Sequence, residues 1–191
     1  EISRGIVNSL RLKLGGGRRR YETSIEAYNL YLRARSLPVQ RGLRGVDESI
    51  GPLQEAIAKD PSFAPAYAGL AAAHAARSGQ TRFDLADEMV KMRAAAEKAI
   101  QLDPLLAEAH DALGIVYALD AQWEQSEKSF RRAIELDRSR SESYHHVAMF
   151  LILPLGRIEE ALQQLRVAEK ADPLSARVQH SLAYVLISAG R

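Results

Sequence analysis

An Asp followed by Pro, or once by Arg, recurs four times along this 191-residue chain, each time after an Ala-rich segment. The second residues of these pairs lie 43, 34 and 35 residues apart. A recurring unit of about 34 residues is typical of arrays of helix–turn–helix repeats. One helical hairpin cannot bury both of its faces, so the sequence predicts that each copy packs against the next. The four pairs are Asp60-Pro61, Asp103-Pro104, Asp137-Arg138 and Asp172-Pro173.

Residues 107–138 form the most regular copy. Leu113 and Tyr117 lie at helical spacing in its first half, and Phe130 and Ile134 do so in its second half. A short polar segment separates the two halves. Apolar residues that recur at i, i+3, i+4 and i+7 are typical of amphipathic helices, so this copy is predicted to form two helices joined by a short turn.

This copy resembles the tetratricopeptide repeat, whose pattern is an aromatic residue, Leu-Gly, Tyr, Ala, Phe, Ala and finally Pro. The corresponding residues here are His110, Leu113, Gly114, Tyr117, Ser126, Phe130, Ala133 and Arg138. The resemblance implies an all-α fold, a right-handed superhelical stack of antiparallel helix pairs, over residues 21–191. The implied repeats span about 24–61, 64–104, 107–140 and 141–175, with a partial repeat at 176–191.

The first repeat departs from the regular pattern. Its turn, at residues 37–45, is longer than the family's turn, and its second helix, at residues 46–59, contains Pro52. Proline lacks an amide donor and clashes with the preceding helical turn. We therefore expect a kink near Ile50–Pro52.

The end of the array is also irregular. The fourth repeat is one residue longer than 34, and Pro154 and Gly156 are expected to separate its two helices. The last predicted helix, at residues 176–189, lacks its partner helix. Part of it would be bare in a monomer, so a homodimer through exposed terminal helices is one expected arrangement. The residues expected to be bare are Leu182, Val185 and Leu186.

Residues 1–20 differ from the array. A stripe of apolar residues spaced by four predicts an amphipathic helix, and Gly15–Gly17 with Arg18–Arg20 predict a flexible Gly/Arg linker. We expect this segment to be the end of a preceding domain. Residues 2–14 and 21–35 together resemble a junction in large bacterial signalling proteins, in which a winged-helix, kinase or cyclase domain precedes a linking domain and then a tetratricopeptide array. The resemblance implies a regulatory module that acts on an upstream effector. The apolar residues are Ile2, Ile6, Leu10 and Leu14.

Charge is distributed unevenly along the chain. Residues 1–45 hold ten Lys or Arg against three acidic residues, a net charge of +7, and the remainder therefore carries −5. A basic segment can attract nucleic acid or a membrane surface. A run such as Arg18–Arg20 is more often a solvated linker, so we do not expect nucleic-acid binding.

Composition and motifs exclude several function classes. The chain has no cysteine, which removes thiol catalysis, disulfides and zinc–cysteine sites. Its longest apolar run, Val147–Leu155, is far shorter than the roughly 20 residues that cross a bilayer, so we expect no membrane span and a cytoplasmic location. Nucleophile-elbow, zinc-protease, phosphate-loop and dinucleotide-binding motifs are absent from the sequence. We expect a non-enzymatic protein without a cofactor.

The tetratricopeptide resemblance places binding on the concave side of the stack, which the first helix of each repeat lines. It implies a protein or peptide ligand whose apolar side chains insert near Ile115, Met149 and Tyr184. Alternatively, some of these apolar residues pack inside their own repeat. The candidate peptide-binding residues are Asn29, Arg33, Asp111, Ile115, Leu119, His145, Met149, Ile152, Arg177, His180 and Tyr184.

The same positions argue against two particular ligands. The family's Lys and Asn clamp for a terminal carboxylate is absent from them. Asp111, His145 and His180 recur at one position of three successive repeats, but neighbouring helices lie about 8–10 Å apart, so we expect no metal site. Glu88 is expected to be an ordinary helix-surface acid, and His74 is expected to pack at a helix contact.

Overall fold

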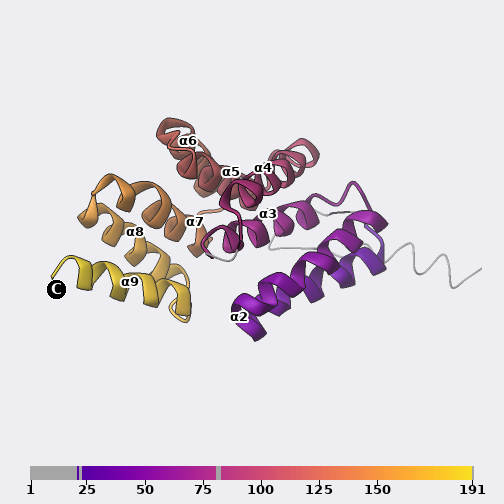
Figure 1. Cartoon of the computed structure of the whole chain (residues 1–191), viewed down its shortest axis with the longest axis horizontal. Coiled ribbons are helices and arrows are strands. Elements are labelled where there is room, and N and C mark those ends of the chain that lie inside the picture. Colours follow the sequence, from indigo (N-terminus) through magenta and orange to yellow (C-terminus); the bar gives the residue numbers. More distant parts are fainter. Residues whose placement is uncertain (1–20, 22, 81–82, 191) are drawn as a thin grey trace, which may run out of the picture.

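The computed structural model describes residues 21, 23–80 and 83–190, and the regular elements of these residues are all helices. Figure 1 shows an arch with α2 (Ile25–Lys59) at one end and α9 (Ala176–Ser188) at the other. Antiparallel helix pairs stack along this arch as the predicted right-handed α-solenoid. The helix and linker predicted for residues 1–20 lie outside the described residues.

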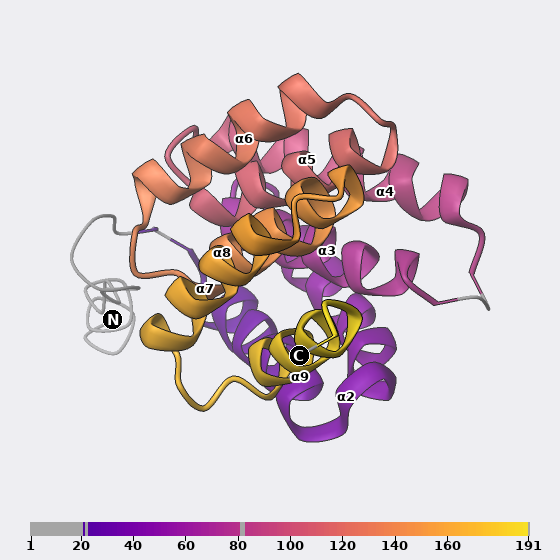
Figure 2. The same ribbon diagram turned by 90° about the vertical axis from the view of Figure 1, so that its left-hand side faces the viewer.

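The remaining helices alternate along the arch. The first helix of each pair is called inner here and the second is called outer. In Figure 2 the stack is seen from the end that carries α9. None of the helices in the described part of the chain has the length and apolarity that a membrane crossing requires. The inner helices are α3 (Ala64–Ser78), α5 (Ala107–Leu119), α7 (Ser141–His146) and α9; the outer helices are α4 (Leu85–Leu102), α6 (Trp123–Leu136) and α8 (Ile158–Ala171).

α2 consists of two helices joined by a sharp reversal at Gly42. This residue has φ 56° and ψ −135°, and a positive φ is readily adopted only by glycine. Lys59 at the end of α2 pairs with Glu26 in its first turn at 2.9 Å, so the two halves run antiparallel. The loop expected at residues 37–45 is therefore mostly helical. The backbone angles of Ile50–Pro52 are helical, so the sharp reversal in this repeat lies at Gly42, and a milder kink at Pro52 stays a prediction.

The recurring Asp residues end four helices in the same way. Each Asp amide donates to the carbonyl of an Ala four residues earlier, and each carboxylate accepts from the amide two residues later at 2.9–3.2 Å. The carboxylate takes the place of a helical carbonyl as the acceptor for this amide. The helix therefore ends there, and the chain turns into the next repeat. The four Ala residues are fully buried, which lets adjacent helices approach closely. The pairs are Asp60 with Ala56, Asp103 with Ala99, Asp137 with Ala133, and Asp172 with Ala168.

The core runs along the stack rather than around one centre. Each helix packs on its neighbours in chain order, and inner helices also contact the next inner helix, α3 with α5 and α5 with α7. One apolar cluster extends from α3 to α9. This arrangement confirms that neighbouring hairpins bury each other's apolar faces. Its largest inaccessible side chains include Met92, Val116, Phe130, Leu165 and Val185.

The extra residue of the fourth repeat is absorbed within its inner helix. α7 continues into a π-helical segment, η1 (Val147–Ile152), and a 3₁₀ turn, η2 (Leu153–Leu155), before Gly156 at φ 73°. α7 begins 34 residues after α5, whereas α8 begins 35 residues after α6. A π-helical turn holds one more residue than an α-helical turn, so η1 restores the register of the stack. The predicted break at Pro154 and Gly156 is confirmed.

The three α9 residues that were expected to be bare are not exposed, so this expectation is wrong. Leu182 and Val185 are buried and Leu186 is half-buried, because they pack on α8 and on the common core. The exposed apolar side chains of α9 are instead Tyr184, which is 54% exposed, and Ile187, which is 75% exposed. A homodimer through this end stays a prediction.

Close contact between α5 and α6 predicts a specific sensitivity at Gly114. A Cβ at this position would lie 2.6 Å from two ring atoms of Phe130, which is itself buried. We expect Gly114→Ala to lower the free energy of unfolding by about 1–3 kcal/mol, as overpacking in a dense core typically does. Urea denaturation followed by circular dichroism measures the change.

Gly79→Ala is the matched control, because Gly79 is exposed, has a φ of −81° and has no atom within 4 Å of a built Cβ. It should stabilise the protein by about 0.4–1 kcal/mol, because alanine restricts the unfolded chain. A Gly114→Ala protein as stable as the wild type would show that the packing of α5 against α6 is looser than described.

Candidate functional site

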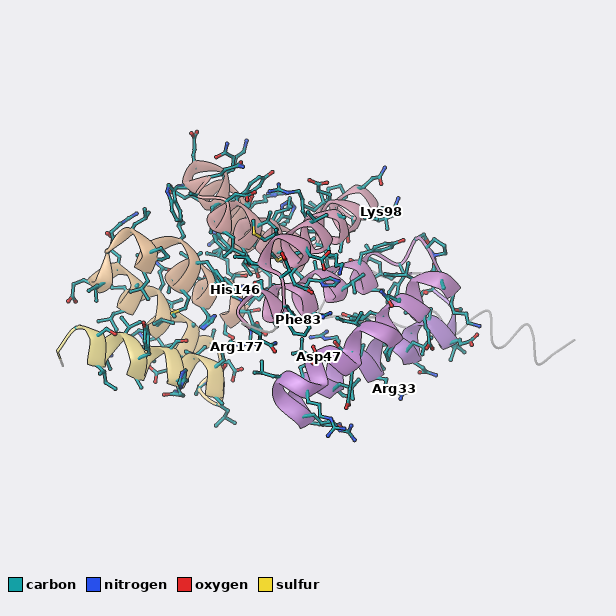
Figure 3. The ribbon with its side chains drawn as sticks, in the orientation of Figure 1. Arg33, Asp47, Phe83, Lys98, His146 and Arg177 are labelled. Carbon is teal, nitrogen blue, oxygen red and sulfur yellow. The ribbon has the colours of Figure 1, made fainter. Side chains whose placement is uncertain are left out.

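The eleven candidate peptide-binding residues fall into three groups by exposure. Buried members lie in the contacts between repeats, and half-buried members border the core. The exposed members lie only near the two ends of the arch, on α2 and α9. Figure 3 labels Arg33 on α2 and Arg177 on α9, which lie on opposite sides of the arch. The buried residues are Asp111, Ile115, His145 and Ile152, the half-buried are Leu119 and Met149, and the exposed are Asn29, Arg33, Arg177, His180 and Tyr184.

Ile115 and Ile152 belong to the core of the stack, with 2% and 6% of their surfaces exposed. Met149 and Leu119 pack against the same cluster from its edge. The middle of the inner face therefore offers little apolar surface to a ligand in this conformation. The positions of these residues agree with the alternative interpretation of the sequence, in which they pack inside the array.

Asp111 is the centre of a buried polar cluster between α5 and α7. Its Oδ2 accepts from Arg140 Nε at 2.9 Å and from Ser143 Oγ at 2.8 Å. Arg140 Nη1 also lies 3.3 Å from Glu108 Oε1, so one guanidinium bridges the starts of two inner helices. Burial alone would raise the pKa of Asp111, but the neighbouring His146 and Arg140 outweigh burial and hold it below its usual value. Asp111 is thus held as a carboxylate that links two repeats.

His145 links the next two inner helices. Its Nε2 shares a hydrogen bond of 2.9 Å with Ser181 Oγ on α9. Burial, with smaller contributions from the charges of His146 and Arg177, lowers the pKa of His145 to about 3. The imidazole is therefore neutral at physiological pH. His146 faces Asp111 instead, at 3.9 Å, so the two adjacent histidines have different partners, as their helical spacing predicts.

A second buried cluster joins α3 to α4. Glu88 is 1% exposed, and its Oε2 lies 2.6 Å from His74 Nδ1. Arg77 adds its Nη2 at 3.4 Å from the other Glu88 oxygen and stacks over the Phe83 ring at 3.7 Å. The expectation that Glu88 is an ordinary surface acid is therefore wrong. The signal available in the sequence was His74 itself, which stands 43 residues before Tyr117 at the tyrosine position of the repeat and brings a polar ring to a helix contact.

Among the inner helices, α9 carries the most exposed side chains. Arg177, His180 and Tyr184 are exposed and follow the i, i+3, i+7 spacing of one helical stripe. Glu142, on the neighbouring α7, is also exposed. This stripe offers a cation, an imidazole and an aromatic ring, a combination that suits recognition of a polypeptide more than of a buried small molecule. We call Arg177, His180 and Tyr184 the α9 stripe.

The polar clusters do not form a metal site. No group of three or more potential His, Asp or Glu ligands converges among the described residues. Asp111 and His145 are buried in different helix contacts, and His180 is exposed to solvent. The three positions that share a place in the repeat pattern are thus separated by the stack itself.

Solved structures share the stacked helix pairs of this chain. A thermophilic tetratricopeptide protein of Thermus thermophilus, TTC0263, matches with a TM-score of 0.67 and 24% identity, over 85% of this chain and 82% of that one. The chain has the tetratricopeptide repeat fold. PilF of Pseudomonas aeruginosa matches with a TM-score of 0.57 and 20% identity, over 86% of this chain and 69% of that one.

Two longer proteins match over a part of their length. The O-GlcNAc transferase of Thermobaculum terrenum matches with a TM-score of 0.54 and 21% identity, over 67% of this chain and 23% of that one. Superkiller protein 3 of Schizosaccharomyces pombe is 26% identical over 152 residues, which are 76% of this chain. The chain spans about a tenth (10%) of the length of that relative. No protein-family model matches the chain.

The depressed pKa of His145 predicts how stability depends on pH. In the unfolded chain His145 binds a proton below about pH 6.5, whereas in the folded protein it stays neutral down to about pH 3. The free energy of unfolding should therefore fall as pH is lowered through this window, with His145 contributing up to about 1.4 kcal/mol per pH unit. His145→Gln retains a polar group toward Ser181 without this titration, so its slope between pH 4 and 6 should be shallower.

Urea denaturation at several pH values measures both slopes. His180→Gln is the matched control, because it removes an exposed imidazole from the adjacent inner helix. Slopes that are equal in the wild type and in His145→Gln would contradict the burial of a neutral His145.

Proposed function

We propose that this chain is a non-catalytic protein-interaction scaffold that binds a partner protein or peptide on the inner face of its arch. The observation that carries the proposal is the α9 stripe, an exposed and chemically mixed surface on an inner helix of a repeat stack. Stacked repeats of this type present extended concave surfaces, and such surfaces bind polypeptides. The arrangement of the polar clusters keeps the inner helices in fixed register, which preorganises the face.

The ligand contacts are proposed at the exposed candidates rather than at the buried ones. Arg177, His180 and Tyr184 form one contact region, and Asn29 and Arg33 on α2 form a second at the opposite end of the arch. A ligand that reaches both regions would be an extended segment or a partner domain. Because Tyr184 is half exposed and tyrosine is enriched in binding hot spots, it is the proposed anchor.

A regulatory role toward an upstream effector domain is the second candidate. The resemblance that supports it rests on residues 2–14, which lie outside the described residues, and on residues 21–35, which include the start of α2. The basic residues of α2 give little support for nucleic-acid binding, because Arg41 and Arg44 are both paired with Glu48. Partner binding through the inner face is compatible with either a scaffold or a regulatory module.

Selection from a random peptide library displayed on phage tests the scaffold proposal. Peptides enriched on the wild-type protein are synthesised, and their dissociation constants are measured by fluorescence anisotropy. We expect the double variant Arg177→Glu/Tyr184→Ala to bind at least about tenfold more weakly, since one lost hot spot is worth about 2 kcal/mol. These exposed positions are chosen over Met149, because an Asp at Met149 would also disturb the core that it borders.

Arg132→Glu is the matched control, since it changes an exposed arginine on the outer helix α6. Its affinity for the selected peptides should match that of the wild type. Selected peptides that bind the α9-stripe variant as tightly as the wild type would exclude the stripe as the binding surface.

A further inference from the structure

The outer face of the stack contains a pocket that the inner-face function does not use. It lies between α6 and α8, has a volume of about 520 Å³, and is floored by the π-helical segment η1. Small-molecule sites typically have volumes of roughly 300–1,000 Å³. α6 and α8 lie side by side in both ribbon views (Figures 1 and 2). The accessible apolar lining consists of the half-buried Ile134 and Tyr144, with the buried Phe130, Val147, Leu151 and Ile152 beneath them.

The preceding repeat shows why this pocket is open. Arg93 and Tyr117 stand 34 residues before Glu127 and Leu151, both of which line the pocket. In the earlier repeat the Arg93 guanidinium lies over the Tyr117 ring, 5.2 Å from its centroid, and also pairs with Asp120. Replacement of this stacked pair by a glutamate and a leucine removes the ring and its cover. The space that the pair occupies in one repeat is therefore left as a hollow in the next.

The rim of the pocket carries three arginines and three glutamates, and Arg138 is the arginine of this rim for which the described residues provide no ion pair. Two of its arginines are neutralised by carboxylates on the same rim, Arg131 by Glu127 and Arg157 by Glu160. Glu135 pairs with an arginine outside the pocket. Arg138 is exposed and makes no ion pair with any carboxylate of the described residues. Only its backbone carbonyl is engaged, by the Tyr144 hydroxyl at 3.2 Å.

We propose that this pocket binds a small amphiphilic anion, with an aliphatic or aromatic body over the η1 floor and one carboxylate or sulfonate paired with Arg138. The apolar floor favours burial of the body, and the single unpaired guanidinium at the edge selects one negative charge. π-Helical turns frequently lie at functional sites, and here the π-helical segment forms the floor. This site is independent of the inner-face binding proposed above, because it lies on the outer helices.

The test uses 8-anilinonaphthalene-1-sulfonate, an aromatic sulfonate whose fluorescence rises in an apolar site. The probe is titrated into the protein and then displaced with decanoate or with decanol. We expect saturable binding of about one probe per chain and displacement by decanoate at concentrations about tenfold lower than by decanol, since decanoate alone carries the charge. Equal displacement by the two competitors would overturn the assignment to Arg138.

Two kinds of variant locate the site. Gln164→Trp fills the pocket from its half-buried rim on α8 without changing the charge of the rim, so it should fold and lose probe binding. Arg138→Gln is a surface change that should weaken decanoate binding about tenfold, whereas the matched Arg166→Gln, an exposed arginine of α8 outside the pocket, should leave it unchanged. Unchanged probe binding in Gln164→Trp, or equal effects of the two arginine variants, would overturn the proposal.

Discussion

The close approach of small side chains at helix contacts is the constraint on which this structure depends. Four alanines, one near the end of each repeat, are fully buried beneath the Asp residues that end the helices. Alanine brings helix axes close together and gives up little conformational entropy, so a long stack forms without a large central core. The same closeness makes Gly114 necessary where the Phe130 ring meets α5. A stack held together in this way has two separate faces, and each can carry its own ligand.

The repeat pattern predicts the fold because its signal is local. Asp-Pro punctuation, helical spacing and the break at Pro154 each depend on residues close together in the chain, and the helix ends lie where these signals place them. The reversal of the chain at Gly42 was not predicted, because a glycine in a segment that resembles a long turn does not show that the residues on both sides of it are helical.

The candidate site was harder to predict, because exposure depends on contacts between repeats. The repeat position of Asp111 indicates a groove residue, yet Arg140 and Ser143 from the following repeat cover it. Glu88 reads as a surface acid until His74 from the preceding helix is placed beside it. The outer pocket lies where Glu127 and Leu151 stand at the positions of the Arg93–Tyr117 pair of the preceding repeat, and neither residue belongs to a motif. The role of a charged residue in these sites therefore depends more on its partner in a neighbouring helix than on its own type.

Hydrogen exchange of the native protein, read by mass spectrometry on peptides from each helix, tests the central claim most directly. If neighbouring hairpins stabilise one another, protection should be highest in α4, α5 and α6, which have neighbours on both sides, and should fall toward α9 and the first half of α2. Equal protection in all helices, with exchange only through one global unfolding event, would instead indicate a single cooperative globule and would contradict a stack that is stabilised by nearest neighbours.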